Sequence, residues 1–205
     1  MIVKTFVLGM LENNVYLVID EDSKEAVLID CTLFSEDIIN TLKEYGAKLK
    51  YILLTHGHFD HILGINEFRK ALQPKVYVSQ EDKTLVNNVD IFMGKYGMPF
   101  TSSIPELDGV LEEQDLKLGN KNIEVIHTPG HTKGSVCFLI DKTLFSGDTI
   151  FLESVGRTDL EGGSFTELSN SIKNNIYTLD DNTEIYPGHG PKTSVKHEKE
   201  YNQYV

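Results

Sequence analysis

The sequence has 205 residues, of which 40% are hydrophobic and 24% are charged. This length predicts one domain over residues 1–205, and no apolar stretch approaches the length that crosses a bilayer. The formal net charge of −12 disfavours sequence-independent binding to nucleic acid, which needs a positive surface. We therefore expect a protein that acts on a small molecule, without a nucleic-acid or membrane partner.

The first half of the chain predicts strands that alternate with helices. Short apolar runs between turn residues indicate strands over residues 1–8, 14–20, 25–30, 49–54 and 76–78. Helices are expected over residues 35–45 and from about 64 to 72, each followed by a helix breaker. Residues 79–106 are less regular, and two interpretations stay open: a mobile cover over a substrate cleft, or helical turns packed on the core.

The second half is richer in strands, which are expected over residues 122–127, 135–140, 143–146 and 184–186. Residues 165–178 form the clearest helix, because Ser164 and Glu167 match a capping box and an apolar stripe follows them. A short polar helix is expected to close the chain. No linker or repeat divides the sequence, in agreement with a single domain.

The expected location is the cytoplasm. The first strand, residues 1–8, lacks the long apolar region and the small-residue cleavage site of a signal peptide. Cys31 and Cys137 both lie in apolar runs, so they are expected as buried free thiols and not as a disulfide.

A concentration of metal-ligand side chains follows the apolar strand 49–54. The sequence there is Thr55-His56-Gly57-His58-Phe59-Asp60-His61. Ligands at the carboxyl end of a strand lie where open sheets place their binding sites. Imidazole and carboxylate together suit a divalent metal such as zinc, iron, manganese or nickel. So dense a cluster therefore predicts a metal site and not an incidental polar loop.

Three later strands also run into a glycine-flanked ligand. The segments are Pro129-Gly130-His131, Gly147-Asp148-Thr149 and Gly188-His189-Gly190. Glycine beside a ligand allows unusual backbone angles and a close approach of the chain to the metal. The repetition of this arrangement is more specific than any one case, and it adds His131, Asp148 and His189 to the predicted ligands.

Seven ligands are too many for one tetrahedral ion, so we predict two divalent ions, with Zn²⁺ preferred and Fe or Mn also suitable. The first ion is assigned to His56, His58 and His131, and the second to Asp60, His61 and His189. Asp148 is the predicted bridge, because a carboxylate has two oxygens. His127 is read as a strand-end residue in preference to an outer-shell donor, and His197 as a solvated residue.

With these motifs the sequence resembles the metallo-β-lactamase superfamily, and within it the glyoxalase II-like (hydroxyacylglutathione hydrolase-like) hydrolases. The resemblance rests on residues 55–61, 128–135, 146–149, 156–159 and 187–191, which span nearly the whole chain. It implies an α/β fold of the four-layer αββα kind, in which two mixed sheets face each other, helices lie outside, and the metal site is at one edge.

The resemblance also implies an enzyme, in which a metal-activated bridging hydroxide attacks the carbonyl of a thioester or of a related ester or lactone. Asp60 is given a catalytic role, because it can hold the proton of the nucleophile or orient the water. Arg157 is a candidate for binding a substrate carboxylate, since a guanidinium suits that group. An ion pair between Arg157 and Asp159 is an equally weighted interpretation.

A second enzyme class stays open. Sulfur dioxygenases of the same superfamily share the stretch 156–159, and His56, His131 and Asp148 could form a two-histidine, one-carboxylate iron site for a persulfide dioxygenase. A class of β-lactamases in the superfamily carries arginine and cysteine at the positions of His61 and Asp148, so hydrolysis of β-lactams is not expected.

Overall fold

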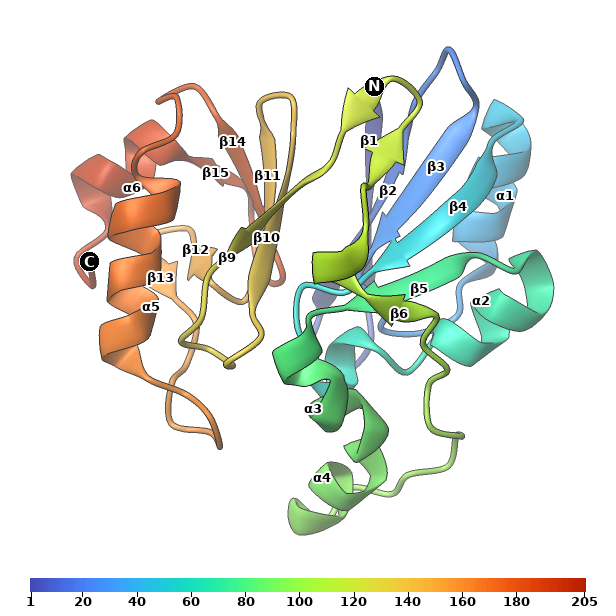
Figure 1. The fold of residues 1–205 in the computed structure, drawn as a ribbon, viewed down its shortest axis with the longest axis horizontal. Helices are drawn as coiled ribbons and strands as arrows, with labels where there is room; N and C mark the ends of the chain where they lie inside the picture. Colours follow the sequence, from blue (N-terminus) through green and yellow to red (C-terminus); the bar gives the residue numbers. More distant parts are fainter.

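Two β-sheets face each other in the computed structural model, which describes residues 1–205, and helices lie on the outer side of each sheet (Figure 1). One sheet has six strands and the other five, and each contains both parallel and antiparallel pairs. The predicted four-layer αββα arrangement of two mixed sheets is therefore confirmed.

The first sheet has the strand order β1-β2-β3-β4-β5-β6. Its strands are β1 (Ile2–Leu8), β2 (Asn13–Ile19), β3 (Glu25–Ile29), β4 (Lys48–Leu53), β5 (Lys75–Val78) and β6 (Gly109–Val110). The first three are antiparallel and the rest continue in parallel. Parallel neighbours need crossover connections. Those connections carry the helices α1 (Glu36–Tyr45), α2 (Ile65–Leu72), α3 (Lys83–Asn87) and α4 (Val89–Lys95).

The second sheet has the order β15-β14-β11-β10-β9. Its strands are β9 (Glu124–His127), β10 (Val136–Ile140), β11 (Thr143–Gly147), β14 (Glu184–Pro187) and β15 (Thr193–Ser194). Its outer helices are α5 (Phe165–Ser171), which continues as a π-helix over Ile172–Ile176, and α6 (Val195–Tyr201). Two small hairpins pair β7 (Lys117–Leu118) with β8 (Lys121–Asn122), and β12 (Ile150–Phe151) with β13 (Ser154–Val155).

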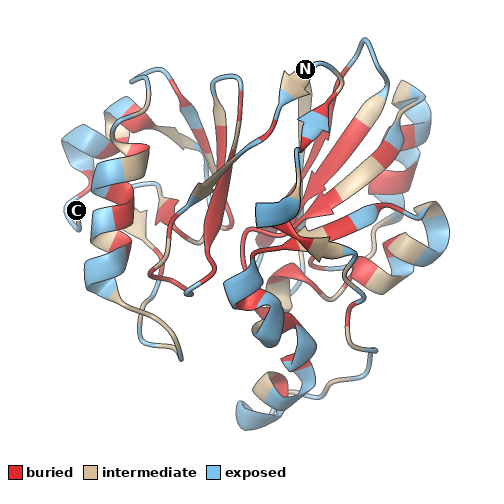
Figure 2. Ribbon diagram, viewed as in Figure 1, coloured by how far each residue is buried: buried red, intermediate tan, exposed pale blue.

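The core lies in three layers, between the sheets and beneath each set of helices (Figure 2). Strand β2 is buried along its whole length and shows how the layers are supplied. Its side chains alternate between the two faces, as strand geometry requires. Tyr16 and Val18 pack between the sheets. The alternate residues pack under the helices of the first sheet, namely Val15, Leu17 and Ile19.

Hydrogen bonds join the two sheets near the ends of their strands. The hydroxyl of Tyr16 donates to the carbonyl of Pro187 at 2.5 Å, and Nδ2 of Asn14 donates to the same oxygen at 3.0 Å. The backbone N–H of Asn14 donates to the carbonyl of Gly188 at 2.7 Å. Strand β2 of the first sheet is thereby tied to the end of β14 in the second.

The predicted long elements are all present, with small shifts of their ends. The helix predicted over 165–178 ends at Ile176, after its π-helical turn. Its capping box is only half formed, because Oγ of Ser164 accepts from the N–H of Glu167 at 3.3 Å while the N–H of Ser164 donates to Gly130. The very short strands β6–β8, β12, β13 and β15 were not predicted, since two residues carry no periodicity.

Two open points concern the segment 79–106 and the cysteines. The segment forms α3 and α4. Their side chains Val86, Val89 and Met93 are buried in the core layer beneath the helices of the first sheet. The interpretation as helical turns packed on the core is thus the one observed. Both cysteines are buried and free, as predicted.

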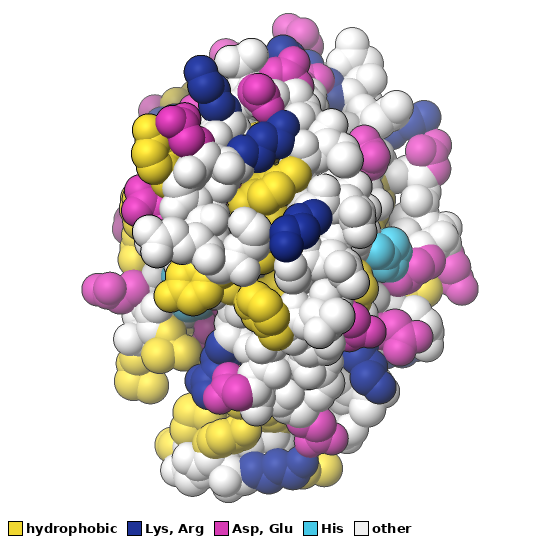
Figure 3. Space-filling view, turned by 90° about the vertical axis from the view of Figure 1, so that its left-hand side faces the viewer, with side chains coloured by type: hydrophobic (Ala, Val, Ile, Leu, Met, Phe, Trp, Pro, Cys, Tyr) yellow, Lys and Arg dark blue, Asp and Glu magenta, His cyan; other side chains and the backbone are white.

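The surface carries charges of both signs. On the face that carries α5 and α6, Lys and Arg side chains are interspersed with Asp and Glu (Figure 3). Apolar side chains gather at the lower end of this view, the end that carries α4 in Figure 1. None of the helices has an apolar stretch that could span a bilayer.

The layer between the sheets gives a first testable prediction. Phe138 of β10 is completely buried there, so we expect Phe138→Ala to lower the free energy of unfolding by about 3–5 kcal/mol through lost burial and a residual cavity. Urea denaturation followed by circular dichroism measures this change. The control Val7→Ala removes a side chain that is 60% exposed, and it should shift stability by less than about 0.5 kcal/mol. A loss below about 1 kcal/mol for Phe138→Ala would contradict the described packing.

Candidate metal centre

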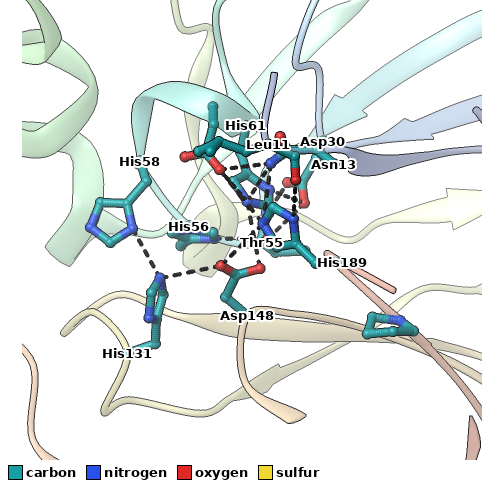
Figure 4. A network of polar contacts seen from close by, with 12 residues as sticks. Leu11, Asn13, Asp30, Thr55, His56, His58, His61, His131, Asp148 and His189 are labelled. Atoms are coloured by element: carbon teal, nitrogen blue, oxygen red, sulfur yellow. Dashed lines mark hydrogen bonds and ion pairs between the residues drawn. The ribbon is translucent and has the colours of Figure 1, made fainter. Parts of the chain in front are cut away.

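The structure brings all seven predicted ligands to one place. The loop after β4 provides His56, His58, Asp60 and His61, and the loop before β10 provides His131. The ends of β11 and β14 provide Asp148 and His189. Six of these side chains point toward one another in Figure 4, with Asp148 between the loops of the two sheets. Asp60 joins them through contacts of its Oδ2 with His61 and His189.

Three groups within the cluster have the compactness of a metal site. In each group the potential ligand atoms lie within 4.8 Å of one another. The groups are His56, His58 and His131; His56, His61 and Asp148; and Asp60, His61 and His189. The first and the third are the two triads that the sequence assigned to separate ions. Their role as metal ligands stays a prediction.

Asp148 lies between the two triads. Its Oδ1 is 3.5 Å from Nε2 of His61, and its Oδ2 is 3.6 Å from Nε2 of His131 and 3.6 Å from Nε2 of His189. One carboxylate therefore faces imidazoles of both triads. This position is the one that the predicted bridging role requires.

Backbone carbonyls determine which ring nitrogen carries the proton in two of the imidazoles. Nδ1 of His131 lies 2.7 Å from the carbonyl of Arg157, and Nδ1 of His189 lies 2.9 Å from the carbonyl of Leu11. Because a carbonyl only accepts, each Nδ1 carries a proton. In the neutral ring, Nε2 then presents its lone pair to the cluster, which is the form that binds a metal.

Asp30 and Thr55 fix two further imidazoles. Oδ2 of Asp30 is 2.8 Å from Nδ1 of His61 and accepts from the hydroxyl of Thr55 at 2.8 Å. That hydroxyl has one proton, so it can only accept from Nδ1 of His56, which is 3.1 Å away. Four of the five imidazoles thus direct Nε2 toward the cluster.

Several buried polar atoms in the cluster have no hydrogen-bond partner. They include Nε2 of His56, Nε2 of His58 and Oδ1 of Asp148. Nδ1 of His58 faces Nε2 of His131 at 2.9 Å. Unpartnered buried groups of this kind cost free energy. A divalent cation would give imidazole and carboxylate atoms a shared partner, so the donor set fits a metal.

The protonation of the cluster is uneven. Burial lowers the pKa of His61, but the carboxylates of Asp60, Asp30 and Asp148 outweigh it and raise this pKa to about 9. Burial likewise opposes the hydrogen bonds to Asp148 and Asp60 that raise the pKa of His189 to about 10. Burial and the neighbouring imidazole of His131 lower the pKa of His58 to about 3. Protons on His61 and His189 thus balance the carboxylates, and a bound cation would take their place.

Asn13 contacts the second triad and was not predicted as a site residue. Its Nδ2 is 2.7 Å from Oδ2 of Asp60, 3.1 Å from Nε2 of His61 and 3.3 Å from Nε2 of His189. The sequence indicated only a turn at this position. The contact depends on an isolated bridge between Asn13 and His189, which no local pattern reveals.

Asp82 holds the two ligand loops together. Its Oδ2 accepts from the N–H of Gly57 at 2.9 Å and from the hydroxyl of Thr132 at 2.7 Å, and its Oδ1 accepts from the N–H of Gly134 at 2.8 Å. Gly57 lies between His56 and His58, and Thr132 follows His131. A carboxylate that is 1% exposed thus fixes one loop of each sheet. Sequence reasoning missed it, because Asp82 lies in an irregular segment.

Gly188 shows why a glycine precedes a ligand. A Cβ at this position would lie 2.2 Å from Oδ1 of Asp148 and 3.0 Å from Cε1 of His61. Any side chain would therefore displace the cluster. The expectation that glycine allows a close approach is confirmed here.

A cavity of about 390 Å³ opens above the cluster. Asp60, His131, Asp148 and His189 form its polar floor, and Phe92 and Phe151 form part of its wall. Arg157 also lines it, and its Nε and Nη2 donate to the carboxylate of Asp159 at 2.7 and 2.8 Å. The predicted ion pair with Asp159 is thus observed, while contact of Arg157 with a substrate stays a prediction.

The two remaining histidines lie outside the cluster. His127 is exposed at the end of β9, with Nε2 3.8 Å from a carboxylate oxygen of Glu112, so it is a strand-end residue as preferred. His197 is half-buried, and its Nε2 is 2.9 Å from Oε1 of Glu153. The description of His197 as a solvated residue was therefore incomplete, since it pairs with a residue brought close by the fold.

Comparison with protein families decides the membership of the chain. The profile of the metallo-beta-lactamase superfamily matches residues 8–189. The chain belongs to this superfamily. The match begins at the end of β1 and includes every residue of the cluster.

Two relatives of this chain have names that describe hydrolases. A probable metallo-hydrolase of Streptococcus pyogenes is 34% identical and covers 94% of this chain and 85% of its own. Hydroxyacylglutathione hydrolase GloC of Haemophilus influenzae is 33% identical and covers 90% of this chain and 89% of its own. Superfamily membership together with these relatives supports a metallo-hydrolase.

Solved structures of the superfamily share the fold over almost the full length. The BLEG-1 B3 metallo-beta-lactamase has a TM-score of 0.89 and 36% identity, and 99% of each chain is covered. TTHA1623, solved in a di-iron-bound form, has a TM-score of 0.85 and 33% identity, with 98% of this chain and 100% of the other covered. ETHE1 from Myxococcus xanthus has a TM-score of 0.79 and 27% identity, with 99% and 84% covered.

The contacts of Asp82 give a prediction about the stability of the site. In Asp82→Asn, an amide N–H₂ replaces one oxygen and faces at least one donor, so we expect the free energy of unfolding to fall by about 1–3 kcal/mol. Urea denaturation measures the change. Asp22→Asn, in an exposed turn, is the matched control and should stay within about 0.5 kcal/mol. Equal stability of both variants would mean that Asp82 does not hold the loops.

Proposed function

We propose that the protein is a glyoxalase II-like thioesterase that uses two divalent ions, with zinc preferred, to hydrolyse a thioester or a related ester or lactone. The observation that carries the proposal is the convergence of imidazoles from both ligand triads on the carboxylate of Asp148. The relative named hydroxyacylglutathione hydrolase supports the substrate class. A small molecule as substrate, the absence of nucleic-acid and membrane partners, and a cytoplasmic location belong to the same proposal.

We assign the seven residues to the two cations as follows. His56, His58 and His131 would hold one cation and Asp60, His61 and His189 the other, with Asp148 between them. When bound, the two cations supply a hydroxide nucleophile near neutral pH and stabilise negative charge on the carbonyl oxygen.

The chain itself orients the reactants. Asp60 lines the cavity and, as a carboxylate, can accept a hydrogen bond from a water molecule and direct it toward a carbonyl carbon. Nδ2 of Asn13 donates to Oδ2 of Asp60 and restricts its orientation. The apolar walls formed by Phe92 and Phe151 exclude other water from the reacting bond.

A persulfide dioxygenase with one iron is the second candidate. The triad predicted for it was His56, His131 and Asp148. The compact two-histidine, one-carboxylate group in the structure is instead His56, His61 and Asp148, while Nε2 of the predicted His131 lies 3.6 Å from Oδ2 of Asp148. The similar structure in a di-iron-bound form keeps iron among the metals to be tested. Iron in the purified protein, with oxygen uptake on glutathione persulfide, would favour this candidate. Two zinc ions and no oxygen uptake would reject it.

Metal analysis and chelation test the proposal directly. We expect elemental analysis of freshly purified protein to give about two divalent ions per chain. Removal of the metal with a chelator should abolish thioester hydrolysis, and addition of Zn²⁺ should restore it. Hydrolysis that survives complete metal removal would refute the mechanism. A β-lactam belongs in the same substrate panel, because one similar structure is named a β-lactamase.

Asp148→Ala should lose metal and activity together, with a fall in kcat/KM of at least about a hundredfold. The matched control is His127→Ala, which removes an exposed imidazole outside the cluster and should keep both metal and activity. Full activity of Asp148→Ala would show that this carboxylate does not join the two triads.

Arg157 is the proposed contact for a substrate carboxylate. Asp159 occupies Nε and Nη2 of the guanidinium, so Nη1 is the donor proposed to reach the substrate. We expect Arg157→Ala to raise KM about tenfold for a thioester that carries a carboxylate, since a charged hydrogen bond is lost. The KM of an uncharged thioester should not change. An equal effect on both substrates would assign Arg157 to loop structure alone.

A further inference from the structure

A second cavity adjoins the one above the cluster. It also measures about 390 Å³, and the two share the lining residues Leu11, Phe59, Asp60, Phe92, Arg157 and Leu160. Asp60 stands at the junction, because it belongs both to the second ligand triad and to the lining of both cavities. A molecule with its reacting bond at the cluster can therefore extend into the second cavity without a break.

The second cavity is lined mainly by apolar side chains, nine of fourteen residues. They come from separate parts of the chain: Met10 from the turn after β1, Leu33 from the segment after β3, Leu63 from the metal loop, and Tyr96 and Met98 from the end of α4. Met10 is 94% exposed, Tyr96 55% and Leu33 44%. Large exposed apolar side chains that converge on one cavity indicate a binding surface for apolar matter.

The charges around this cavity argue against a strongly charged ligand arm. Asp60 and Arg157 are the only charged residues in its lining. The guanidinium of Arg157 donates through Nε and Nη2 to the carboxylate of Asp159, which leaves only Nη1 for one substrate carboxylate. A tripeptide arm such as glutathione carries two carboxylates and an ammonium group, and Arg157 is the one cation in this lining for the two carboxylates. An uncharged aliphatic or aromatic arm would instead gain burial against Leu33, Leu63 and Met98.

We propose that this apolar cavity binds the uncharged hydrocarbon arm of the substrate, so that the enzyme prefers thioesters with extended apolar acyl groups. The proposal rests on the proposed thioesterase function and adds the substrate class. The cluster cavity takes the carbonyl group, and the second cavity takes the chain attached to it.

A chain-length series tests the proposal. The substrates are thioesters of the neutral thiol N-acetylcysteamine with straight acyl chains of increasing length, used with the metal-loaded protein. We expect kcat/KM to rise about two- to fourfold for each added methylene until the cavity is filled. A glutathione thioester with a short acyl group is the charged comparison and should react less well. Equal kcat/KM across the neutral series would overturn the proposal.

Variants locate the effect in the second cavity. Leu33→Asp and, as a second case, Tyr96→Asp place a charge in the cavity away from the cluster. Each should lower the ratio of long-chain to short-chain kcat/KM at least tenfold. Val7→Asp, at an exposed position outside both cavities, should leave this ratio unchanged. An unchanged ratio in both cavity variants, with the fold verified by circular dichroism, would also overturn the proposal.

Binding measurements separate this proposal from the proposed function. Thioether analogues, in which CH₂ replaces the carbonyl, cannot be hydrolysed, and calorimetry gives their Kd. We expect Kd to fall with chain length and to rise in Leu33→Asp. Chain-dependent binding without hydrolysis of any thioester would reject the thioesterase while retaining the cavity. Hydrolysis of thioesters together with a Kd that does not change with chain length would reject the proposed role of the second cavity and retain the thioesterase function.

Discussion

The rest of the structure depends on keeping two carboxylates and five imidazoles in contact where the two sheets meet. Four of the five imidazoles are buried, and buried polar groups need partners to offset the loss of water. The protein meets this demand with short strands whose ends stop at the seam between the sheets, and each end carries one or more ligands. The fold therefore serves mainly to bring these ends together.

A second set of groups controls how the ligands point. Four groups each contact Nδ1 of one imidazole, so that its Nε2 faces the cluster. They are Asp30, Thr55 and the backbone carbonyls of Leu11 and Arg157. Asp82 acts one step further away and fixes the loops that carry the ligands. Orientation is thus set by ordinary hydrogen bonds to groups that would attract no notice in the sequence.

The long strands and the seven clustered residues were predicted because each leaves a local sign, whereas the four layers were implied by the resemblance to the superfamily. Apolar runs mark the strands, and a histidine or aspartate beside glycine marks the end of a strand. The supporting groups leave no such sign. Asp30 looks like an ordinary strand end, Asn13 like a turn and Asp82 like part of an irregular loop. Their importance arises only from contacts between distant segments, such as the bridge of Asn13 to His189. The two-residue strands were missed for a related reason, since pairing and not composition creates them.

The division of the cluster between the two sheets has a consequence for how the protein matures. Four of the proposed ligands follow β4 of the first sheet, while His131, Asp148 and His189 belong to the second. Neither half of the polypeptide holds a complete set of donors. Under the proposed two-ion function, the two halves must dock before both cations bind tightly, because the first half alone contributes four of the seven donor residues. Metal binding as proposed would then follow the synthesis and the docking of both halves.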